Sequence, residues 1–239
     1  MTRQPLRAVL FDKDGTLLDF EASWSRLYSE LALELAEGDA AAARAMLVAG
    51  GLDEVSGRYR PGAVLSAGNT LDITRLWFPT LRDRAFAAMV GRIDAAFHEN
   101  GIRSSVPVAG LAETLGILAG MGLEMGVATS DGTEAARAAL KALGVADRLP
   151  HVFGYDSVPH PKPAPDIVHA FAGAIGMTPA EIAVVGDNRH DLEMARAAGA
   201  GAAIGVLTGN GAEADLAPLA DAVLPSIREL PAWIRQNRK

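Results

Sequence analysis

Cysteine is absent from this chain. Its absence excludes disulfide bonds, thiolate nucleophiles and cysteine metal ligands, and it is compatible with a reducing compartment. Long apolar runs are absent as well, since none approaches the roughly 20 residues that a membrane-spanning helix needs. The first apolar run meets Asp12 almost at once, so we expect no signal peptide. These absences together predict a cytoplasmic protein with no membrane partner.

Basic residues are in the minority. The chain has 22 Lys and Arg against 29 Asp and Glu, and its net charge of -7 argues against nucleic acid as a partner. Lysine is especially rare and occurs only as Lys13, Lys141, Lys162 and Lys239, so each lysine carries slightly more weight as a candidate. The 239 residues, 49% of them hydrophobic, suit one globular domain with a substantial insertion, or two small domains.

The sequence contains two kinds of hydrophobic pattern. Residues 20–103 repeat apolar side chains every three or four positions, which predicts helices over 23–38, 39–51 and 81–101. Residues 9–11 and the part after Val106 instead alternate between strand and helix patterns. The expected strands are 9–11, 123–129, 151–155, 182–187, 202–207 and 222–224, and the expected helices are 109–122, 133–144, 165–176, 192–199 and 227–236.

This alternation predicts an α/β fold with a doubly wound parallel sheet, in other words a Rossmann-like core, because right-handed crossovers place helices between parallel strands. The first strand belongs to the same sheet, so the helical block is an insertion between the first two strands. We therefore predict a catalytic core of residues 1–19 and 104–239 and an all-helical cap domain of residues 20–103.

Polar side chains collect where the predicted strands end. They are Asp12 and Asp14 after the first strand, Thr129 and Ser130 after the second, Asp187 and Asp191 after the fourth, and Lys162 in the loop HPKPAPD. Ligands of open α/β sheets bind outside the carboxyl ends of the strands. We therefore expect these side chains to meet at one edge of the sheet.

These residue types suit phosphoryl transfer. A carboxylate can attack phosphorus and form an aspartyl-phosphate, and a second carboxylate can protonate the leaving oxygen and then activate water. Mg²⁺ prefers oxygen ligands and would neutralise carboxylates that otherwise face a phosphate dianion. A lysine and a hydroxyl complete the set by stabilising charge on the phosphoryl oxygens.

Each of these residues also has a purely structural interpretation. Asp187 precedes a predicted helix and could be its N-cap, and Asp191 could complement the helix dipole. Thr129 could simply end a strand, and Lys162 could be a solvated loop charge. Lys13 is expected to have no role, because alternation along a strand turns it away from the carboxylates on either side.

In this order, DKDGTL, VATSD, HPKPAPD and GDNRHD resemble the four motifs of the haloacid dehalogenase superfamily. The resemblance is closest to phosphoglycolate-phosphatase-like members, which carry a helical cap between the first two motifs. It implies the following roles: nucleophile for Asp12, general acid and base for Asp14, phosphoryl ligands for Thr129 and Lys162, and Mg²⁺ ligands for Asp12, the Asp14 carbonyl, Asp187 and, through water, Asp191. Two positions depart from the pattern, with Lys13 where apolar residues are common and Ser130 where Asn is common.

The sequence also bears on the other reactions that similar proteins catalyse. Dehalogenases that resemble this fold lack the second aspartate, so Asp14 argues against them, and phosphonatases use a cap lysine, which residues 20–103 do not contain. A phosphomutase acting on a sugar phosphate stays open, because it needs the same aspartate pair. A phosphorylation-dependent signalling module and a non-catalytic binding protein are further alternatives, against which the DxDGT spacing and the large insertion argue.

The segment GRYRPGAVLSAGNTLD, residues 57–72, breaks the helical period of the insertion. Loops on a rigid frame commonly carry specificity, so we expect this segment to face the active site, with Ser130 as a further substrate contact. An arginine can hold a carboxylate through two hydrogen bonds. We therefore predict that Arg58 or Arg60 selects a small phosphorylated acid such as phosphoglycolate. The oligomeric state is not predicted.

Overall fold

The computed structural model describes residues 4–237, and its centre is a parallel six-stranded sheet with the order β3-β2-β1-β4-β5-β6. The strands are β1 (Ala8–Phe11), β2 (Glu124–Ala128), β3 (His151–Phe153), β4 (Ile182–Gly186), β5 (Ala202–Val206) and β6 (Ala222–Leu224). The order reverses at β1, which lies between β2 and β4. This arrangement confirms the predicted Rossmann-like sheet.

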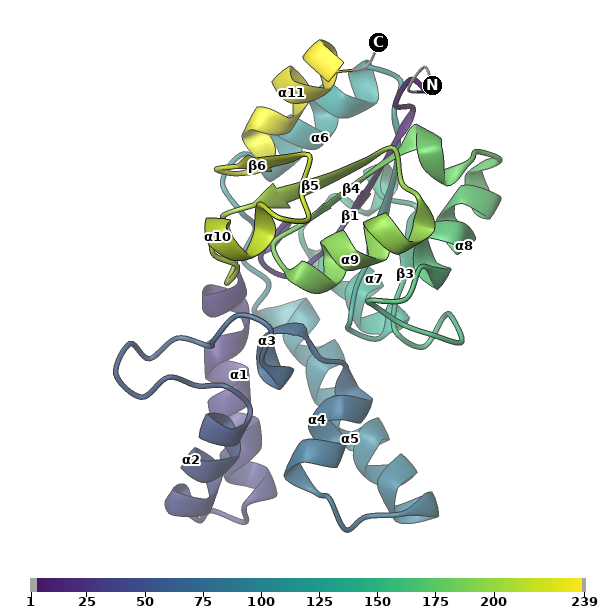
Figure 1. Ribbon diagram of the computed structural model, residues 1–239. Coiled ribbons are helices and arrows are strands. Elements are labelled where there is room, and N and C mark those ends of the chain that lie inside the picture. Colours follow the sequence, from purple (N-terminus) through teal and green to yellow (C-terminus); the bar gives the residue numbers. More distant parts are fainter. Residues whose placement is uncertain (1–3, 238–239) are drawn as a thin grey trace.

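Helices cover both faces of the sheet (Figure 1). On one face lie α6 (Leu111–Gly120), α7 (Thr133–Ala142) and α11 (Leu230–Asn237), and on the other lie α8 (Asp166–Ile175), α9 (Arg189–Ala198) and α10 (Glu213–Leu216). Each face buries its own apolar cluster, as expected for a sheet whose central strands are covered on both sides. The fold is therefore doubly wound, as predicted.

The register of the central strands places their ends at one edge. All four residues of β1 are fully buried apolar side chains. Its last residue, Phe11, pairs with Val127 of β2 and with Val185 of β4, so the three strands end nearly level. The polar residues that follow these strands consequently emerge side by side.

The helical insertion, residues 20–103, forms a separate layer that projects from the sheet (Figure 1). It consists of α1 (Phe20–Leu35), α2 (Ala40–Ala49), α3 (Val64–Ala67), α4 (Thr70–Trp77) and α5 (Asp83–Arg103). These helices bury an apolar cluster of their own, which is rich in aromatic residues. Within residues 4–237, none of the helices is both long and apolar enough to cross a membrane.

Hydrogen bonds join the two points where the chain passes between the sheet and the insertion. Asp19 caps α1 by accepting a hydrogen bond from the backbone N–H of Ala22 at 3.0 Å. The buried Asn100 side chain donates to the backbone oxygen of Ser23 at 2.9 Å, and the Ser23 hydroxyl oxygen accepts from the backbone N–H of Val106 at 3.0 Å. The outgoing and returning segments are therefore tied together.

The segment 57–72 is more helical than the sequence pattern predicted. It contains α3 and the first turn of α4, whose N-cap is Asn69. The Asn69 side chain accepts from the backbone N–H groups of Leu71 and Asp72, and the Asp72 carboxylate accepts from the backbone N–H of Asn69. This capping box begins the helix where hydrophobic periodicity is too short to show it.

Candidate active site

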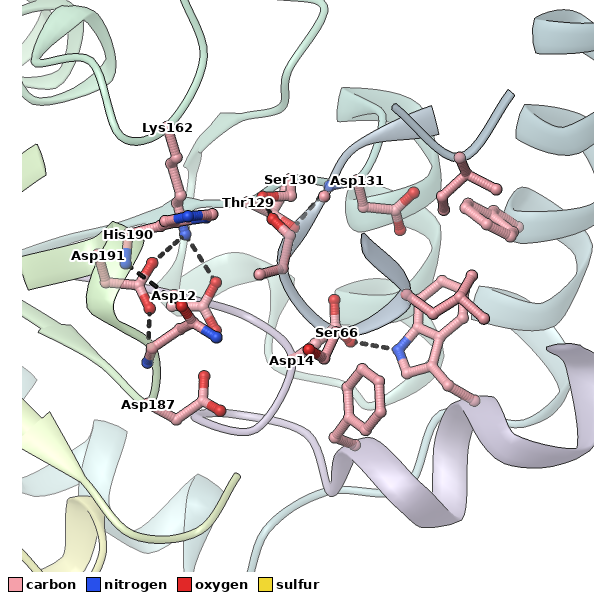
Figure 2. Close-up of a pocket in the computed structure, with 18 of the residues that line it drawn as sticks. Asp12, Asp14, Ser66, Thr129, Ser130, Asp131, Lys162, Asp187, His190 and Asp191 are labelled. Atoms are coloured by element: carbon pink, nitrogen blue, oxygen red, sulfur yellow. Dashed lines mark hydrogen bonds and ion pairs between the residues drawn. The ribbon is translucent and has the colours of Figure 1, made fainter. Parts of the chain in front are cut away.

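A pocket lies between the carboxyl edge of the sheet and the helical insertion (Figure 2). The core supplies mainly charged and polar side chains, and the insertion supplies mainly aromatic and aliphatic ones. Among the lining residues are seven predicted site residues, namely Asp12, Asp14, Thr129, Ser130, Lys162, Asp187 and Asp191. The structure thus brings together residues that are up to 179 positions apart in the sequence.

Lys162 links two of the carboxylates. Its ammonium group donates to Asp12 Oδ1 at 2.7 Å and to Asp191 Oδ1 at 2.6 Å, and its side chain is only 2% exposed. Burial by itself lowers the pKa of Lys162, but the two carboxylates outweigh burial and raise the pKa above its usual value. Lys162 is therefore a fixed positive charge in the pocket and not a solvated loop residue.

Asp12, Asp187 and Asp191 form a compact carboxylate cluster. Each offers an oxygen, and these oxygens lie within 4.8 Å of one another. Burial raises the pKa of Asp12 to about 7; Lys162 opposes this shift, and Asp191 adds to it. Burial and the negative charge of Asp12 hold the pKa of Asp187 well above its usual range. Such mutual repulsion is relieved when a cation binds.

The donor atoms of this cluster fit a hard divalent cation. All three residues offer carboxylate oxygens, which Mg²⁺ prefers. Asp12 Oδ2 is buried and has no hydrogen-bond partner among the described residues. A buried acceptor without a partner is costly, so this oxygen is available to a metal ion or a reacting group.

Asp187 sits in a tight enclosure. Its Oδ2 accepts from the backbone N–H of Asn210 at 2.9 Å. A Cβ added at Gly15, Gly209 or Gly211 would collide with Asp187, so each of these positions requires glycine. The loop after β5, which carries Gly209 and Gly211, therefore holds this carboxylate in place. Sequence reasoning missed this loop, although two glycines directly after a strand end were a usable signal.

Asp191 both caps a helix and binds a lysine of the pocket. Its Oδ2 accepts from the backbone N–H of Asn188 at 3.1 Å, which completes a capping box at the start of α9, and its Oδ1 binds Lys162. Asn188, not Asp187, is the N-cap residue of this helix. The capping interpretation of Asp187 was therefore wrong, and that carboxylate is left for the cluster.

Asp14 is held from two sides. Its Oδ1 accepts from the indole N–H of Trp24 on α1 at 2.6 Å, and its Oδ2 lies 2.6 Å from the ammonium group of Lys13. Lys13 is buried, with 1% of its side chain exposed, and also lies 3.4 Å from Asp131 Oδ2. Burial lowers the pKa of Lys13, but Asp14 and Asp131 more than compensate and raise it.

The expectation that Lys13 points away from the carboxylates was wrong. Strand β1 ends at Phe11, so the alternation of side chains no longer applies at Lys13. The chain turns instead, and Lys13 lies beneath the pocket. A lysine between two aspartates, in a chain with few lysines, was the signal that could have identified it.

The loop after β2 connects the core to the insertion. Thr129 Oγ1 accepts from the backbone N–H of Asp131 at 3.1 Å, and the Ser130 hydroxyl donates to the backbone oxygen of Ala67 at 3.1 Å. Burial raises the pKa of Asp131 to about 6, and the neighbouring Lys13 opposes this shift. Asp131 lines the pocket, yet sequence reasoning assigned it no role.

Comparison with known proteins places this geometry in a family. The family of haloacid dehalogenase-like hydrolases matches residues 6–199, which include all four motifs. The chain belongs to this family. The match begins before the first strand, includes the whole helical insertion and ends before β5.

Relatives of this haloacid dehalogenase-like hydrolase include two curated proteins. A phosphoglycolate phosphatase from Rhodospirillum rubrum is 31% identical over 195 residues, which cover 81% of this chain and 76% of the relative. A probable phosphatase, IndB, from Dickeya dadantii is 37% identical over 131 residues, which cover 54% of this chain and little more than half of IndB, 56%. A crystal structure of a predicted phosphoglycolate phosphatase from Haemophilus somnus has the same fold, with a TM-score of 0.74, 21% identity and coverage of 98% and 99% of the two chains.

Two residues that were predicted to bind substrate in this haloacid dehalogenase-like hydrolase lie outside the pocket. Arg58 is 63% exposed, its Nε lies 3.8 Å from Glu21 Oε1, and it lines a separate cavity beside α1. Arg60 is exposed as well. The segment 57–72 does reach the pocket, but with Leu65, Ser66, Ala67 and Gly68.

Proposed function

We propose that this chain is a Mg²⁺-dependent phosphatase that hydrolyses small phosphorylated metabolites through an aspartyl-phosphate on Asp12. The observation that carries the proposal is the buried, unpartnered Oδ2 of Asp12 at the carboxyl edge of the sheet, with Lys162 on its other oxygen. The phosphatases among the relatives support the same reaction class. The relative that acts on phosphoglycolate makes that ester the first substrate to test.

The proposed reaction has two displacements at phosphorus. Asp12 attacks the phosphorus atom, the bond to the ester oxygen breaks, and Asp14 gives its proton to the leaving oxygen. Asp14 then takes a proton from water, the resulting hydroxide attacks phosphorus, and the bond to Asp12 breaks. Asp14 and Asp12 return to their starting states, and inorganic phosphate leaves.

Other residues of the chain stabilise the charge that moves in these steps. Lys162 and the hydroxyl of Thr129 contact the phosphoryl oxygens, and Ser130 contacts the rest of the substrate. Asp12, Asp187 and the backbone oxygen of Asp14 would hold the cation directly, and Asp191 would hold it through water. When bound, Mg²⁺ would supply positive charge that reduces the repulsion between the phosphoryl dianion and the carboxylates.

The helical insertion acts as a cap in this proposal, with the core formed by residues 1–19 and 104–239. Contacts that hold it against the core include Trp24 to Asp14, Ser130 to Ala67, and the Tyr155 hydroxyl to Asp94 Oδ2 at 2.8 Å. A cap in this position excludes water that would otherwise compete in the first step.

The test is phosphate release from p-nitrophenyl phosphate by the wild-type protein with Mg²⁺ and with a chelator. Asp12→Asn should reduce turnover to less than a few per cent while circular dichroism stays unchanged, because the amide is a poor nucleophile. Asp147→Asn makes the same change at an exposed site outside the pocket and should retain full activity. Hydrolysis by Asp12→Asn at the wild-type rate would refute the proposal, and transfer of the phosphoryl group to a sugar instead of water would identify a phosphomutase.

A further inference from the structure

The wall that the insertion contributes to the pocket carries no charged side chain among the described residues. Its apolar and aromatic part consists of Phe20, Trp24, Tyr28, Leu65, Ala67, Ile73 and Phe97. In the proposed reaction this wall faces the leaving group, because the core holds the phosphoryl group. A charged group placed against such a wall loses hydration and gains no partner, which is costly.

The hydroxyl groups on this side of the pocket offer acceptors only. The Ser66 hydroxyl donates to the backbone oxygen of Arg60 at 2.7 Å, and the Ser130 hydroxyl donates to that of Ala67 at 3.1 Å. A serine hydroxyl has one hydrogen and two lone pairs, so each oxygen has only lone pairs left for a ligand. Lone pairs can bind an O–H group of a leaving group but not a carboxylate.

The charge balance of the pocket points in the same direction. Among the described residues, five carboxylates, a single ammonium group, that of Lys162, and one imidazole, that of His190, line it. Lys162 is held by Asp12 and Asp191, and Lys13 beneath the pocket is held by Asp14 and Asp131. The Mg²⁺ of the proposed reaction would offset the charge of Asp12, Asp187 and Asp191 on the phosphoryl side, so a carboxylate on the leaving group would still meet Asp14 and Asp131 without a free lysine.

We infer that the leaving-group side of this pocket selects a small, uncharged leaving group that carries a hydroxyl, and disfavours a carboxylate such as that of phosphoglycolate. The inference rests on the proposed phosphatase function and narrows its substrate class to phosphate monoesters of small polyols and related neutral alcohols. The cavity is small, about 50 Å³, which favours a small leaving group.

Two substrates of matched size test the inference. 2-Hydroxyethyl phosphate and 2-phosphoglycolate share the same two-carbon frame and differ in an alcohol against a carboxylate. We expect the wild-type kcat/KM to be at least about tenfold higher for 2-hydroxyethyl phosphate, the ratio that a modest desolvation cost produces. Equal kcat/KM values for the two substrates, or a higher value for 2-phosphoglycolate, would overturn the inference.

A positive charge introduced into the wall provides a second test of the inference. Ser66→Lys should shift the ratio of the two kcat/KM values toward 2-phosphoglycolate by about tenfold or more, whereas Ser29→Lys, on the exposed face of α1, should leave it unchanged. An unchanged ratio in a folded Ser66→Lys protein would count against the inference, and the wild-type comparison decides it if that variant does not fold. Failure to hydrolyse any of p-nitrophenyl phosphate, 2-hydroxyethyl phosphate and 2-phosphoglycolate would refute the phosphatase function, while hydrolysis with a preference for the acid refutes only this inference.

Discussion

Trp24, on the first helix of the insertion, donates its indole N–H to Asp14 Oδ1 at 2.6 Å. The contact joins the carboxylate at the end of β1 to a helix outside the sheet. A hydrogen bond to a charged acceptor contributes about 1.5–3 kcal/mol, enough to fix the orientation of the carboxylate. In the proposed reaction, Asp14 must point at the leaving oxygen in the first displacement and at the attacking water in the second, so its orientation affects both.

The first prediction concerns this hydrogen bond. Trp24→Phe removes the donor but retains an aromatic ring, so kcat for esters with poor leaving groups should fall by about tenfold and kcat for p-nitrophenyl phosphate should fall less. Trp77→Phe is the matched control, because Trp77 donates its indole N–H to Met46 O at 3.0 Å, outside the pocket. Identical losses for good and poor leaving groups would contradict a positioning role for Trp24.

The second prediction concerns the buried Lys13. Lys13→Met leaves the carboxylates of Asp14 and Asp131 without their cation, and breaking a buried ion pair costs roughly 3–5 kcal/mol. Denaturant unfolding should show a loss of this order. The double variant with Asp131→Asn removes one uncompensated charge and should recover part of the stability. A double variant less stable than Lys13→Met alone would show that repulsion between Asp14 and Asp131 does not cause the loss of stability.

The third prediction separates two members of the carboxylate cluster. Asp187→Asn removes a charge that the neighbouring carboxylates repel, so it should raise the melting temperature of the metal-free protein while abolishing stabilisation by Mg²⁺. Asp191→Asn also breaks the ion pair with Lys162, so it should lower the metal-free melting temperature. Thermal unfolding with and without Mg²⁺ measures both. If Asp187→Asn retains the wild-type response to Mg²⁺, the residue is not a metal ligand.

The fourth prediction is a pH dependence. The pKa of Asp12 is about 7 in the folded protein, against an ordinary value of 3.8. Because the folded value is the higher one, this group favours the metal-free fold at low pH, and its contribution is lost as the pH rises from about 4 through about 7. Mg²⁺ must displace the proton, so it should raise the melting temperature more at about pH 8 than at about pH 5.5. Equal shifts at both pH values, measured with Asp12→Asn as the control, would argue against a metal site at Asp12.

The sheet and the grouping of the motif residues could be predicted from the sequence for one physical reason. The carboxyl ends of parallel strands lie at one edge, so residues that follow different strands must meet there. Asp12, Thr129 and Asp187 were placed in this way without knowledge of any side-chain contact. The prediction depended only on recognising buried apolar strands, and β1, β2 and β4 are strongly apolar.

The contacts beyond the strand ends could not be predicted in this way. The position of Lys13 depends on a turn that begins one residue after β1, where periodicity carries no information. The partner of Asp14 depends on where the insertion places α1 relative to the end of β1, and the exposed positions of Arg58 and Arg60 depend on the path of an irregular loop. Such features are set by tertiary packing, which local sequence patterns do not encode.

The hydrogen bond from Trp24 also limits how this protein can be re-engineered or diversified by domain exchange. Only ten positions separate Trp24 from Asp14, so one short stretch carries Asp12, its neighbouring carboxylate and the indole that holds it. A chimera that receives the whole insertion of a relative would acquire a new leaving-group wall, and it would keep this partner only if the relative also has tryptophan at that position. Exchanges that begin after the second turn of α1 would keep it, and variation between relatives is therefore expected to be tolerated more readily beyond that point.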